Sequence, residues 1–243
     1  MTNVYLFDVD GTLTPKGAAI SNEIATEFLK FNKSFPSFLS TSKTYQDLRQ
    51  ILPAKILLNC KGVYCSSGSE YYEKGANIYR KEHKFSKFLK VVCETFVKES
   101  NFRYKKSGHF QRKSGSLTVS VVGMKSERPE RLRYMVWDRS VNERTEFIRQ
   151  LNESDLGYDA FLSGNLNIEI MPSDQNKSTI VDDLMERHGA SQITFFGDRI
   201  SKFSHDMPLA ERLREVSIYN RVISVPNPQH TKHHMERLLL AGA

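Results

Sequence analysis

Val4-Tyr5-Leu6-Phe7-Asp8-Val9-Asp10-Gly11-Thr12 is the stretch that decides the fold. Its four leading apolar residues are typical of a short buried strand, and Gly11 and Thr12 predict a tight turn directly after it. Open parallel sheets bind their ligands at the carboxyl ends of the strands. A buried strand that ends in acidic residues therefore predicts an α/β protein with a functional site at this sheet edge.

The two aspartates of this stretch have complementary chemistry. Asp8 and Asp10 are two residues apart, so their side chains share one side while the chain is extended. A carboxylate can attack a phosphate ester as a nucleophile, and a second one can exchange a proton with the leaving or attacking oxygen. We expect these catalytic roles for Asp8 and Asp10, respectively. A plain surface turn is the alternative for the Asp-Gly pair taken alone.

A second acidic cluster follows a late apolar run, in the segment ITFFGDRISKFSHDMPL at 193–209. Asp198 comes directly after the run, and Asp206 lies eight residues later. Converging carboxylates repel one another and require a cation, and hard oxygen ligands that face a phosphate suit Mg²⁺. The expected metal ligands are Asp8, Asp10 through its backbone carbonyl, Asp198 and Asp206.

Two further segments supply groups that can hold a phosphate. Thr41 and Ser42 follow the apolar residues Phe38 and Leu39, and a hydroxyl at that point can donate to phosphoryl oxygens. Lys177 precedes a helical pattern and can neutralise the phosphate charge. A helix N-cap and a solvated lysine are the plain alternatives for these residues.

The order of the patterns predicts a Rossmann-like parallel-sheet core built from both ends of the chain. Strand and helix patterns alternate up to residue 78 and again from 175 to 243, with Ile56–Leu58 expected as a strand. Residues 79–174 differ, because a basic amphipathic helix is expected at 79–90 and strands then follow in succession. We predict an inserted α+β domain with an antiparallel sheet and helices on one face.

The composition limits the classes of partner. A net charge of +7 and a pI near 9.2 favour anions, which include phosphate esters, nucleic acid and acidic membranes. Nucleic acid is disfavoured, since the aromatic residues are not regularly interleaved with the cations. No stretch approaches about 18 apolar residues, so we expect no membrane partner and a cytoplasmic protein. The three cysteines lack the paired spacing of a zinc or redox site.

These motifs together resemble the haloacid dehalogenase-like superfamily. The matching segments are DVDGTLT at 8–14, LSTSK at 39–43, NK at 176–177, and FFGD at 195–198 with a later HD. The inserted domain is similar to the cap of eukaryote-type phosphomannomutases. That similarity rests on GSLTVSVVGMKSERPERLRYMVWD at 115–138, LSGNLNIEIMP at 162–172 and FFGDRISKFSHD at 195–206.

The resemblance implies an activity that the motifs alone do not specify. It implies interconversion of mannose 6-phosphate and mannose 1-phosphate, with an aspartyl phosphate and a hexose 1,6-bisphosphate as intermediate and activator, for GDP-mannose synthesis. It implies a cap that closes over the core, binds the small sugar phosphate and can pair into a homodimer. The implied substrate-binding residues of the cap are Arg131, Lys113, Lys125, Asn165, Asn167 and Glu169.

The chain also departs from that family's pattern, which leaves alternatives open. Met124 stands where the family has an arginine, and Ser40-Thr41-Ser42-Lys43 replaces Gly-Gly-Ser-Asp. The run Asn176-Lys177-Ser178 is more similar to sugar-phosphate phosphatases. The first alternative is therefore a Mg²⁺-dependent sugar-phosphate phosphatase of the same superfamily, and the second is a non-catalytic protein that binds a phosphate ligand. The arginines near Arg131 can equally form a solvated helix face.

Overall fold

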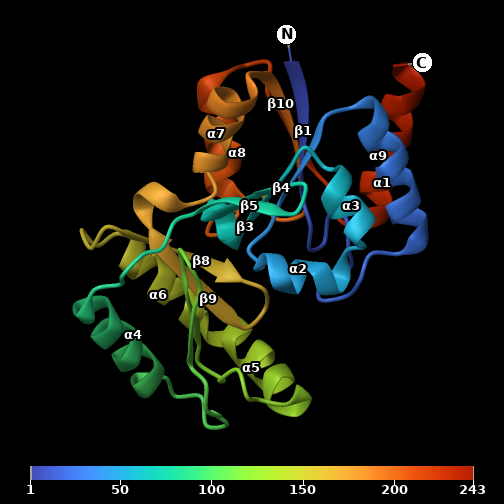
Figure 1. Ribbon diagram of the computed structural model, residues 1–243. Helices are drawn as coiled ribbons and strands as arrows, with labels where there is room; N and C mark the ends of the chain where they lie inside the picture. Colours follow the sequence, from blue (N-terminus) through green and yellow to red (C-terminus); the bar gives the residue numbers. More distant parts are fainter. Residues whose placement is uncertain (1, 243) are drawn as a thin grey trace. The chain divides into compact units, whose positions relative to one another are not determined.

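The structure, a computed structural model, describes residues 2–242 and divides into two compact units (Figure 1). The core unit comprises the chain up to Lys81, Lys177–Ser201 and the residues from Asp206 onward. The inserted unit comprises Glu82–Asn176 and Lys202–His205. The sequence-based boundaries at 78 and 175 differ slightly from these, because a hairpin strand of the core sheet runs through Arg80.

The core unit is built on a seven-stranded sheet in the order β11-β10-β1-β2-β3-β4-β5. The first five strands of this order pair in parallel. A hairpin, β4 and β5, extends the sheet antiparallel from β3. The strand β1 lies in the middle of the parallel part, which suits its almost uniformly apolar sequence. The strands are β11 (Arg221–Ser224), β10 (Ala190–Gly197), β1 (Thr2–Asp8), β2 (Ser37–Ser40), β3 (Gly62–Cys65), β4 (Glu70–Glu73) and β5 (Ala76–Arg80).

Helices cover both faces of this sheet, as Figure 1 shows. One face buries Phe7 and Phe196 against α1 and α9, and the other buries Leu6 and Phe195 against α7 and α8. Ser21 caps α1 by accepting a hydrogen bond from the Ile24 amide. The helices are α1 (Asn22–Ser34), α2 (Tyr45–Ile51), α3 (Ala54–Asn59), α7 (Thr179–His188), α8 (Met207–Val216) and α9 (Pro228–Ala241), with a 3-10 turn at Ser66–Gly68.

The inserted unit is a four-stranded antiparallel sheet in the order β6-β7-β9-β8. Alternation along β9 sends Ile168 and Ile170 into an apolar core against α4 and α6, whereas Glu169 lies on the opposite face of the sheet. The elements are α4 (Lys87–Glu99), β6 (Phe110–Arg112), β7 (Leu117–Ser120), α5 (Arg128–Val141), α6 (Glu143–Asn152), β8 (Tyr158–Ser163) and β9 (Asn167–Pro172), with a 3-10 turn at Ser173–Gln175.

The predicted fold class, a parallel-sheet α/β core with an inserted α+β domain, is confirmed. Two local predictions are wrong. Residues Ile56–Leu58 lie in α3 rather than in a strand, because a short apolar run suits either element and here one side packs on the core. The segment expected as a helix from residue 79 begins as β5, and α4 starts only at Lys87. Within residues 2–242, no helix is both long and apolar enough to span a membrane.

Candidate active site

Strand register in the core unit brings the acidic segments to one sheet edge. Asp8, the last residue of β1, pairs with Ser40 at the end of β2. On the other side Phe7 pairs with Phe196, so that Asp198 follows β10 just beyond the level of Asp8. The carboxyl ends of neighbouring parallel strands therefore carry the acidic residues together, as the sequence predicted.

Two glycines make room for this convergence. Gly11 has φ +92°, and a Cβ atom there would collide with the Asp198 carboxylate. A Cβ atom at Gly197 would lie 2.8 Å from the Phe195 ring and 3.1 Å from Asp206 Oδ2. Any larger residue at either position would displace a carboxylate of the cluster, so both glycines are required by close approach.

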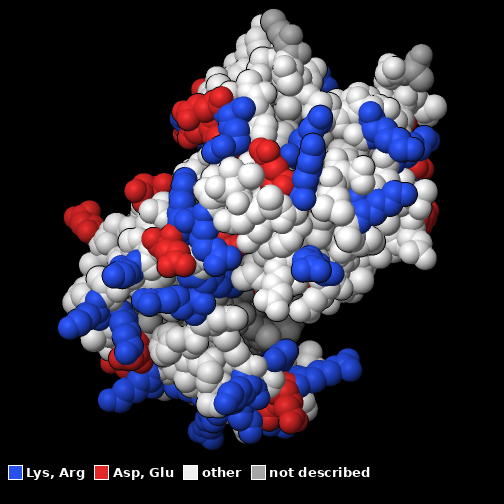
Figure 2. All heavy atoms as spheres, in the orientation of Figure 1, with Lys and Arg blue, Asp and Glu red and all other residues white. Residues whose placement is uncertain are grey.

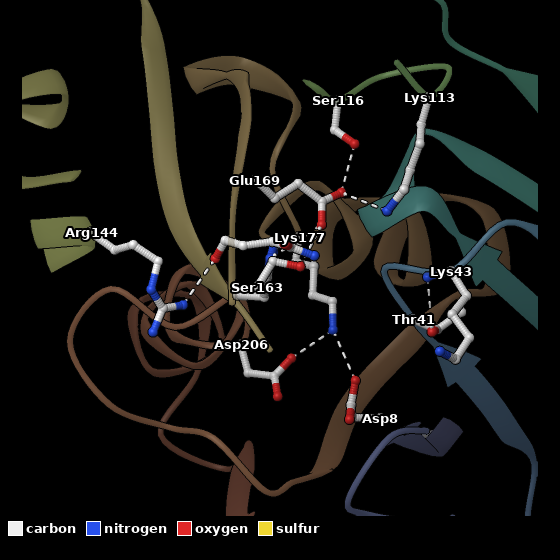
Figure 3. A network of polar contacts seen from close by, with 12 residues as sticks. Asp8, Thr41, Lys43, Lys113, Ser116, Arg144, Ser163, Glu169, Lys177 and Asp206 are labelled. Atoms are coloured by element: carbon white, nitrogen blue, oxygen red, sulfur yellow. Dashed lines mark hydrogen bonds and ion pairs between the residues drawn. The ribbon is translucent and has the colours of Figure 1, made fainter. Parts of the chain in front are cut away.

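Three carboxylates and one ammonium group form the centre of the site, as Figure 3 shows for Asp8, Asp206 and Lys177. The side chains of Asp8, Asp198 and Asp206 each offer an oxygen, and these oxygens lie within 4.8 Å of one another. Lys177 Nζ donates to Asp8 Oδ1 at 3.0 Å and to Asp206 Oδ1 at 2.7 Å. All of these side chains are at least nine-tenths buried. We call Asp8, Asp198, Asp206 and Lys177 the acidic cluster.

The acidic cluster has an excess of negative charge. Burial, the neighbouring Asp206 and Asp198 together raise the pKa of Asp8 to about 8, and the opposing effect of Lys177 is smaller. Burial alone would lower the pKa of Lys177, but Asp206 and Asp8 outweigh burial and raise it, so Lys177 stays charged. One buried ammonium group thus faces more carboxylate charge than it can balance.

A divalent cation fits this arrangement. Its charge would offset the repulsion that raises the Asp8 pKa, and carboxylate oxygens are the ligands that hard cations prefer. The side chains that can hold it are those of Asp8, Asp198 and Asp206, three of the four residues that the sequence predicted. The fourth, Asp10, is outside this group as a side chain.

Asp10 lies beside the cluster with a different set of partners. Its Oδ1 accepts the Gly17 amide at 3.3 Å, and its Oδ2 lies 3.3 Å from Lys43 Nζ. A second lysine, Lys16, lies 2.6 Å from Asp198 Oδ2. Sequence reasoning assigned no role to Lys16 or Lys43, although both follow the acidic and hydroxyl motifs within a few residues.

The two hydroxyl candidates differ in their surroundings. Thr41 is buried, its amide donates to the Tyr64 carbonyl, and its Oγ1 accepts the Lys43 amide at 3.1 Å. In the turn after β3, the Ser67 amide donates a hydrogen bond to the Thr41 carbonyl. Ser42 is half-buried. The loop that follows β2 is therefore held firmly by backbone hydrogen bonds, which suits a fixed phosphate contact.

In the inserted unit, two of the predicted substrate-binding residues form a buried ion pair. Glu169 is fully buried, and its Oε1 accepts Ser116 Oγ at 2.6 Å and Lys113 Nζ at 3.4 Å (Figure 3). Its Oε2 lies 3.4 Å from Ser163 Oγ and 3.3 Å from His205 Nε2. Burial alone would raise the pKa of Glu169, but Lys113, His205 and Ser116 outweigh burial and hold it below its usual value.

The other predicted residues of the inserted unit are more accessible. Arg131 donates from Nε to Ser126 Oγ at 3.3 Å and from a terminal nitrogen to the Met124 carbonyl at 3.2 Å. Lys125 is exposed. Asn165 lies in the exposed turn between β8 and β9, and the Asn167 carbonyl accepts from Arg144 at 3.2 Å. Basic side chains are spread over the face seen in Figure 2, with acidic ones among them.

The fold and the acidic strand ends define a class, the haloacid dehalogenase-like proteins. A solved haloacid dehalogenase-like hydrolase from Bacteroides thetaiotaomicron superposes with a TM-score of 0.60, covering 98% of this chain and 100% of that one at 11% identity.

The comparison of sequences is more specific. The model of the family described as eukaryotic phosphomannomutase matches residues 55–241. Phosphomannomutase of Galdieria sulphuraria is 28% identical, with 96% of this chain and 93% of that protein covered. Phosphomannomutase of Saccharomyces cerevisiae is 25% identical, with 94% and 91% covered. The chain belongs to the eukaryotic phosphomannomutase family and is an enzyme that acts on phosphate substrates.

Proposed function

We propose that this enzyme is a Mg²⁺-dependent phosphomannomutase that interconverts mannose 6-phosphate and mannose 1-phosphate, for GDP-mannose synthesis, with Asp8 as the nucleophile. The observation that carries the proposal is the buried acidic cluster at the sheet edge, with Asp8 bonded to Lys177 and next to two further carboxylates. The relatives named phosphomannomutase, which match over most of the chain, support the choice of substrate.

The proposed reaction has two transfers at Asp8. A carboxylate oxygen of Asp8 attacks the phosphorus of a hexose 1,6-bisphosphate, the bond from phosphorus to the sugar oxygen breaks, and Asp10 gives that oxygen a proton. The hydroxyl of a hexose monophosphate then attacks the aspartyl phosphate, Asp10 takes the proton of the hydroxyl, and free Asp8 is restored. A bound Mg²⁺ would supply positive charge to the phosphoryl oxygens.

The remaining residues of the core unit have supporting roles in this proposal. Lys177 holds Asp8 in place and offsets phosphoryl charge, because its ammonium group is buried and charged. Thr41 and Ser42 donate hydroxyl hydrogen bonds to phosphoryl oxygens. The Gly17 amide and Lys43 orient the Asp10 carboxylate that moves the proton.

Cationic and amide side chains of the inserted unit are proposed to bind the substrate beyond the transferred phosphoryl group. Arg131 and Lys125 suit the second phosphate, because an arginine can bind phosphate through two parallel hydrogen bonds. Asn165 and Asn167 suit sugar hydroxyl groups. Lys113 is the less accessible candidate, since its ammonium group lies 3.4 Å from the buried Glu169.

Hydrolysis of a sugar phosphate is the second candidate function. Met124 offers no charge where the family has an arginine, and a mutase needs cations for both phosphates of one sugar, whereas a phosphatase needs only one set. In that reaction a water molecule replaces the sugar hydroxyl in the second transfer, and Asp10 takes its proton.

One incubation distinguishes the two functions. The protein is mixed with Mg²⁺, mannose 1-phosphate and a catalytic amount of hexose 1,6-bisphosphate, and both inorganic phosphate and mannose 6-phosphate are followed. The mutase proposal requires mannose 6-phosphate to form without a matching release of phosphate. Phosphate release without the isomer would overturn it in favour of the phosphatase.

A further inference from the structure

A turn of three residues in the core unit, Ser66–Gly68, has a positive φ angle at every residue. The angles are +49° at Ser66, +58° at Ser67 and +94° at Gly68. Glycine adopts such angles freely, but they bring the Cβ atom of a serine close to the following carbonyl oxygen. Backbone of this kind persists only where the surrounding structure fixes it, and it is concentrated at functional sites. We call Ser66–Gly68 the serine turn.

The serine turn holds the loop that follows β2 on both sides of Ser42. The Ser66 amide donates to the Lys43 carbonyl at 2.8 Å, and the Ser67 amide donates to the Thr41 carbonyl at 2.9 Å. Within the loop, the Lys43 amide donates to Thr41 Oγ1 at 3.1 Å (Figure 3). The conformation of the turn thus directs two successive amides to one loop. The positions of the Thr41 and Ser42 hydroxyl groups therefore depend on the serine turn.

The serine turn also lies against the start of α7. A Cβ atom at Gly68 would lie 3.1 Å from Ile180 Cγ1 and 3.4 Å from Thr179 Oγ1. The Ile180 amide in turn donates to the carbonyl of Lys177 at 3.2 Å. The turn therefore contacts both segments of the core unit that carry the predicted phosphate-binding groups, the loop after β2 and the start of α7.

A buried carboxylate, Glu70, is bonded to the serine turn. Glu70 is the first residue of β4 and is 2% exposed. Its Oε1 accepts Ser66 Oγ at 3.2 Å, and its Oε2 accepts the Tyr72 hydroxyl at 2.7 Å and Arg80 at 3.3 Å. Within residues 2–242 the buried Ser67 hydroxyl has no hydrogen-bond partner, so Ser66 provides the side-chain attachment of the turn. Hydrogen bonds to a charged acceptor are the stronger ones, which suits a bond that stabilises an unfavourable backbone.

We propose that Glu70 is a positioning residue for phosphoryl binding, which acts through Ser66 and the serine turn on the loop after β2. Glu70 and Ser66 are both buried, so they act through that loop and not by contact with the substrate. This inference rests on the proposed function, in which the hydroxyl groups of Thr41 and Ser42 bind the transferred phosphoryl group. It gives the β4–β5 hairpin a part in the reaction through its first residue.

The test compares two hydroxyl deletions at the same carboxylate in the full chain. Ser66→Ala removes the bond between Glu70 and the serine turn, whereas Tyr72→Phe removes a bond of Glu70 that does not reach the turn. Binding of orthovanadate, which takes the place of the phosphoryl group, is measured by calorimetry in saturating Mg²⁺.

We expect the dissociation constant of orthovanadate to rise roughly 10-fold in Ser66→Ala, because a contact misplaced by about 1 Å can cost about 100-fold and this change only loosens the turn. The value of kcat/KM for mannose 1-phosphate in the mutase assay should fall by a similar factor. Both quantities should stay unchanged in Tyr72→Phe. Mn²⁺ binding without orthovanadate, followed by electron paramagnetic resonance, should stay unchanged in both variants, because the carboxylates of the acidic cluster follow other strands.

Ser66→Gly gives an independent check, because glycine tolerates the positive φ angle while the hydroxyl group is lost. It should weaken orthovanadate binding less than Ser66→Ala does. Wild-type affinity for orthovanadate in every folded Ser66 variant, or an equal loss in Tyr72→Phe, would overturn the proposal. Weakened orthovanadate binding in Ser66→Ala, in a protein whose wild type never forms mannose 6-phosphate, would instead overturn the proposed mutase function and leave the role of Glu70 intact.

Discussion

The acidic cluster of the core unit and the Glu169 site of the inserted unit both bury a carboxylate against a lysine, yet their charges balance differently. In the acidic cluster Lys177 contacts Asp8 and Asp206, Lys16 lies 2.6 Å from Asp198 Oδ2, and the pKa of Asp8 is still raised to about 8. At Glu169 one carboxylate has Lys113, His205 and two serine hydroxyls around it, and its pKa is lowered. Carboxylates whose negative charge is not balanced can bind a cation and take part in a reaction, whereas a carboxylate whose charge is balanced is suited to a structural contact.

The largest expected effect comes from Asp8→Asn. Turnover should fall by about 10⁴-fold or more if Asp8 is the nucleophile, because the amide cannot accept the phosphoryl group. The metal-free variant should unfold at a temperature no lower than the wild type, since a neutral amide replaces a carboxyl group whose ionisation burial and its acidic neighbours oppose. Steady-state kinetics and a thermal melt in a chelator check both parts. A marked drop in melting temperature would show that the cluster is not repulsive.

The next prediction compares how much one carboxylate of each site contributes to the stability of the folded protein. Glu169→Ala leaves Lys113 buried without its counter-charge, and we expect the free energy of unfolding to fall by about 3 kcal/mol. Asp198→Asn instead relieves the repulsion on Asp8 and loses only an ion pair to the exposed Lys16, so the metal-free protein should keep its stability. Urea denaturation in a chelator measures both variants. Equal losses would contradict the difference in charge balance.

The contributions of Asp8 and Glu169 to the stability of the folded protein should change with pH in opposite directions. The pKa of Asp8 is higher in the folded protein than its ordinary 3.8, so its contribution to stability is present in acid and is lost as the pH rises toward about 8. The pKa of Glu169 is lowered, so its contribution is present above its ordinary 4.5 and is lost on acidification.

Thermal melts from pH 5 to 8 in a chelator test this pair of shifts. The metal-free protein should lose stability across this range, and Asp8→Asn should reduce the slope. Saturating Mg²⁺ should do the same, because a bound cation favours the ionised carboxylate. An identical slope in the wild type and in Asp8→Asn would rule out Asp8 as the source.

The smallest expected effect is that of Lys43→Met. Lys43 and Asp10 are both partly exposed, so their pair should contribute within about 1 kcal/mol to stability by urea denaturation. Its kinetic effect should exceed its effect on stability, because Asp10 loses a group that orients it. A loss of stability as large as that of Glu169→Ala would mean that the pair of Lys43 and Asp10 contributes as much as the ion pair of Lys113 and Glu169.

Sequence reasoning could predict the place of the acidic cluster because two of its carboxylates follow a strong local signal. Asp8 and Asp198 end apolar strand patterns, and strand ends in a parallel sheet meet whatever the details of packing. The β4–β5 hairpin had a signal too, in the Lys74-Gly75 turn with positive φ at both residues, but no strand was assigned on either side of it.

The partners of Glu169 could not be predicted in the same way. Lys113 and His205 lie far from it in sequence, and their approach depends on strand register in the inserted unit and on the path of the segment Lys202–His205. Charge alone does not distinguish a carboxylate that waits for a sugar from one that is already bonded. The short run Ile56–Leu58 failed for a related reason, because its packing and not its composition decides between helix and strand.

Direct detection of a phosphorylated Asp8 tests the central claim most directly. The enzyme is mixed with Mg²⁺ and hexose 1,6-bisphosphate, quenched in acid, reduced with borohydride to convert an aspartyl phosphate to homoserine, and analysed by peptide mass spectrometry. We expect homoserine at position 8 in the wild type and none in Asp8→Asn. Turnover with homoserine at another aspartate, or with no phosphorylated aspartate at all, would contradict the account.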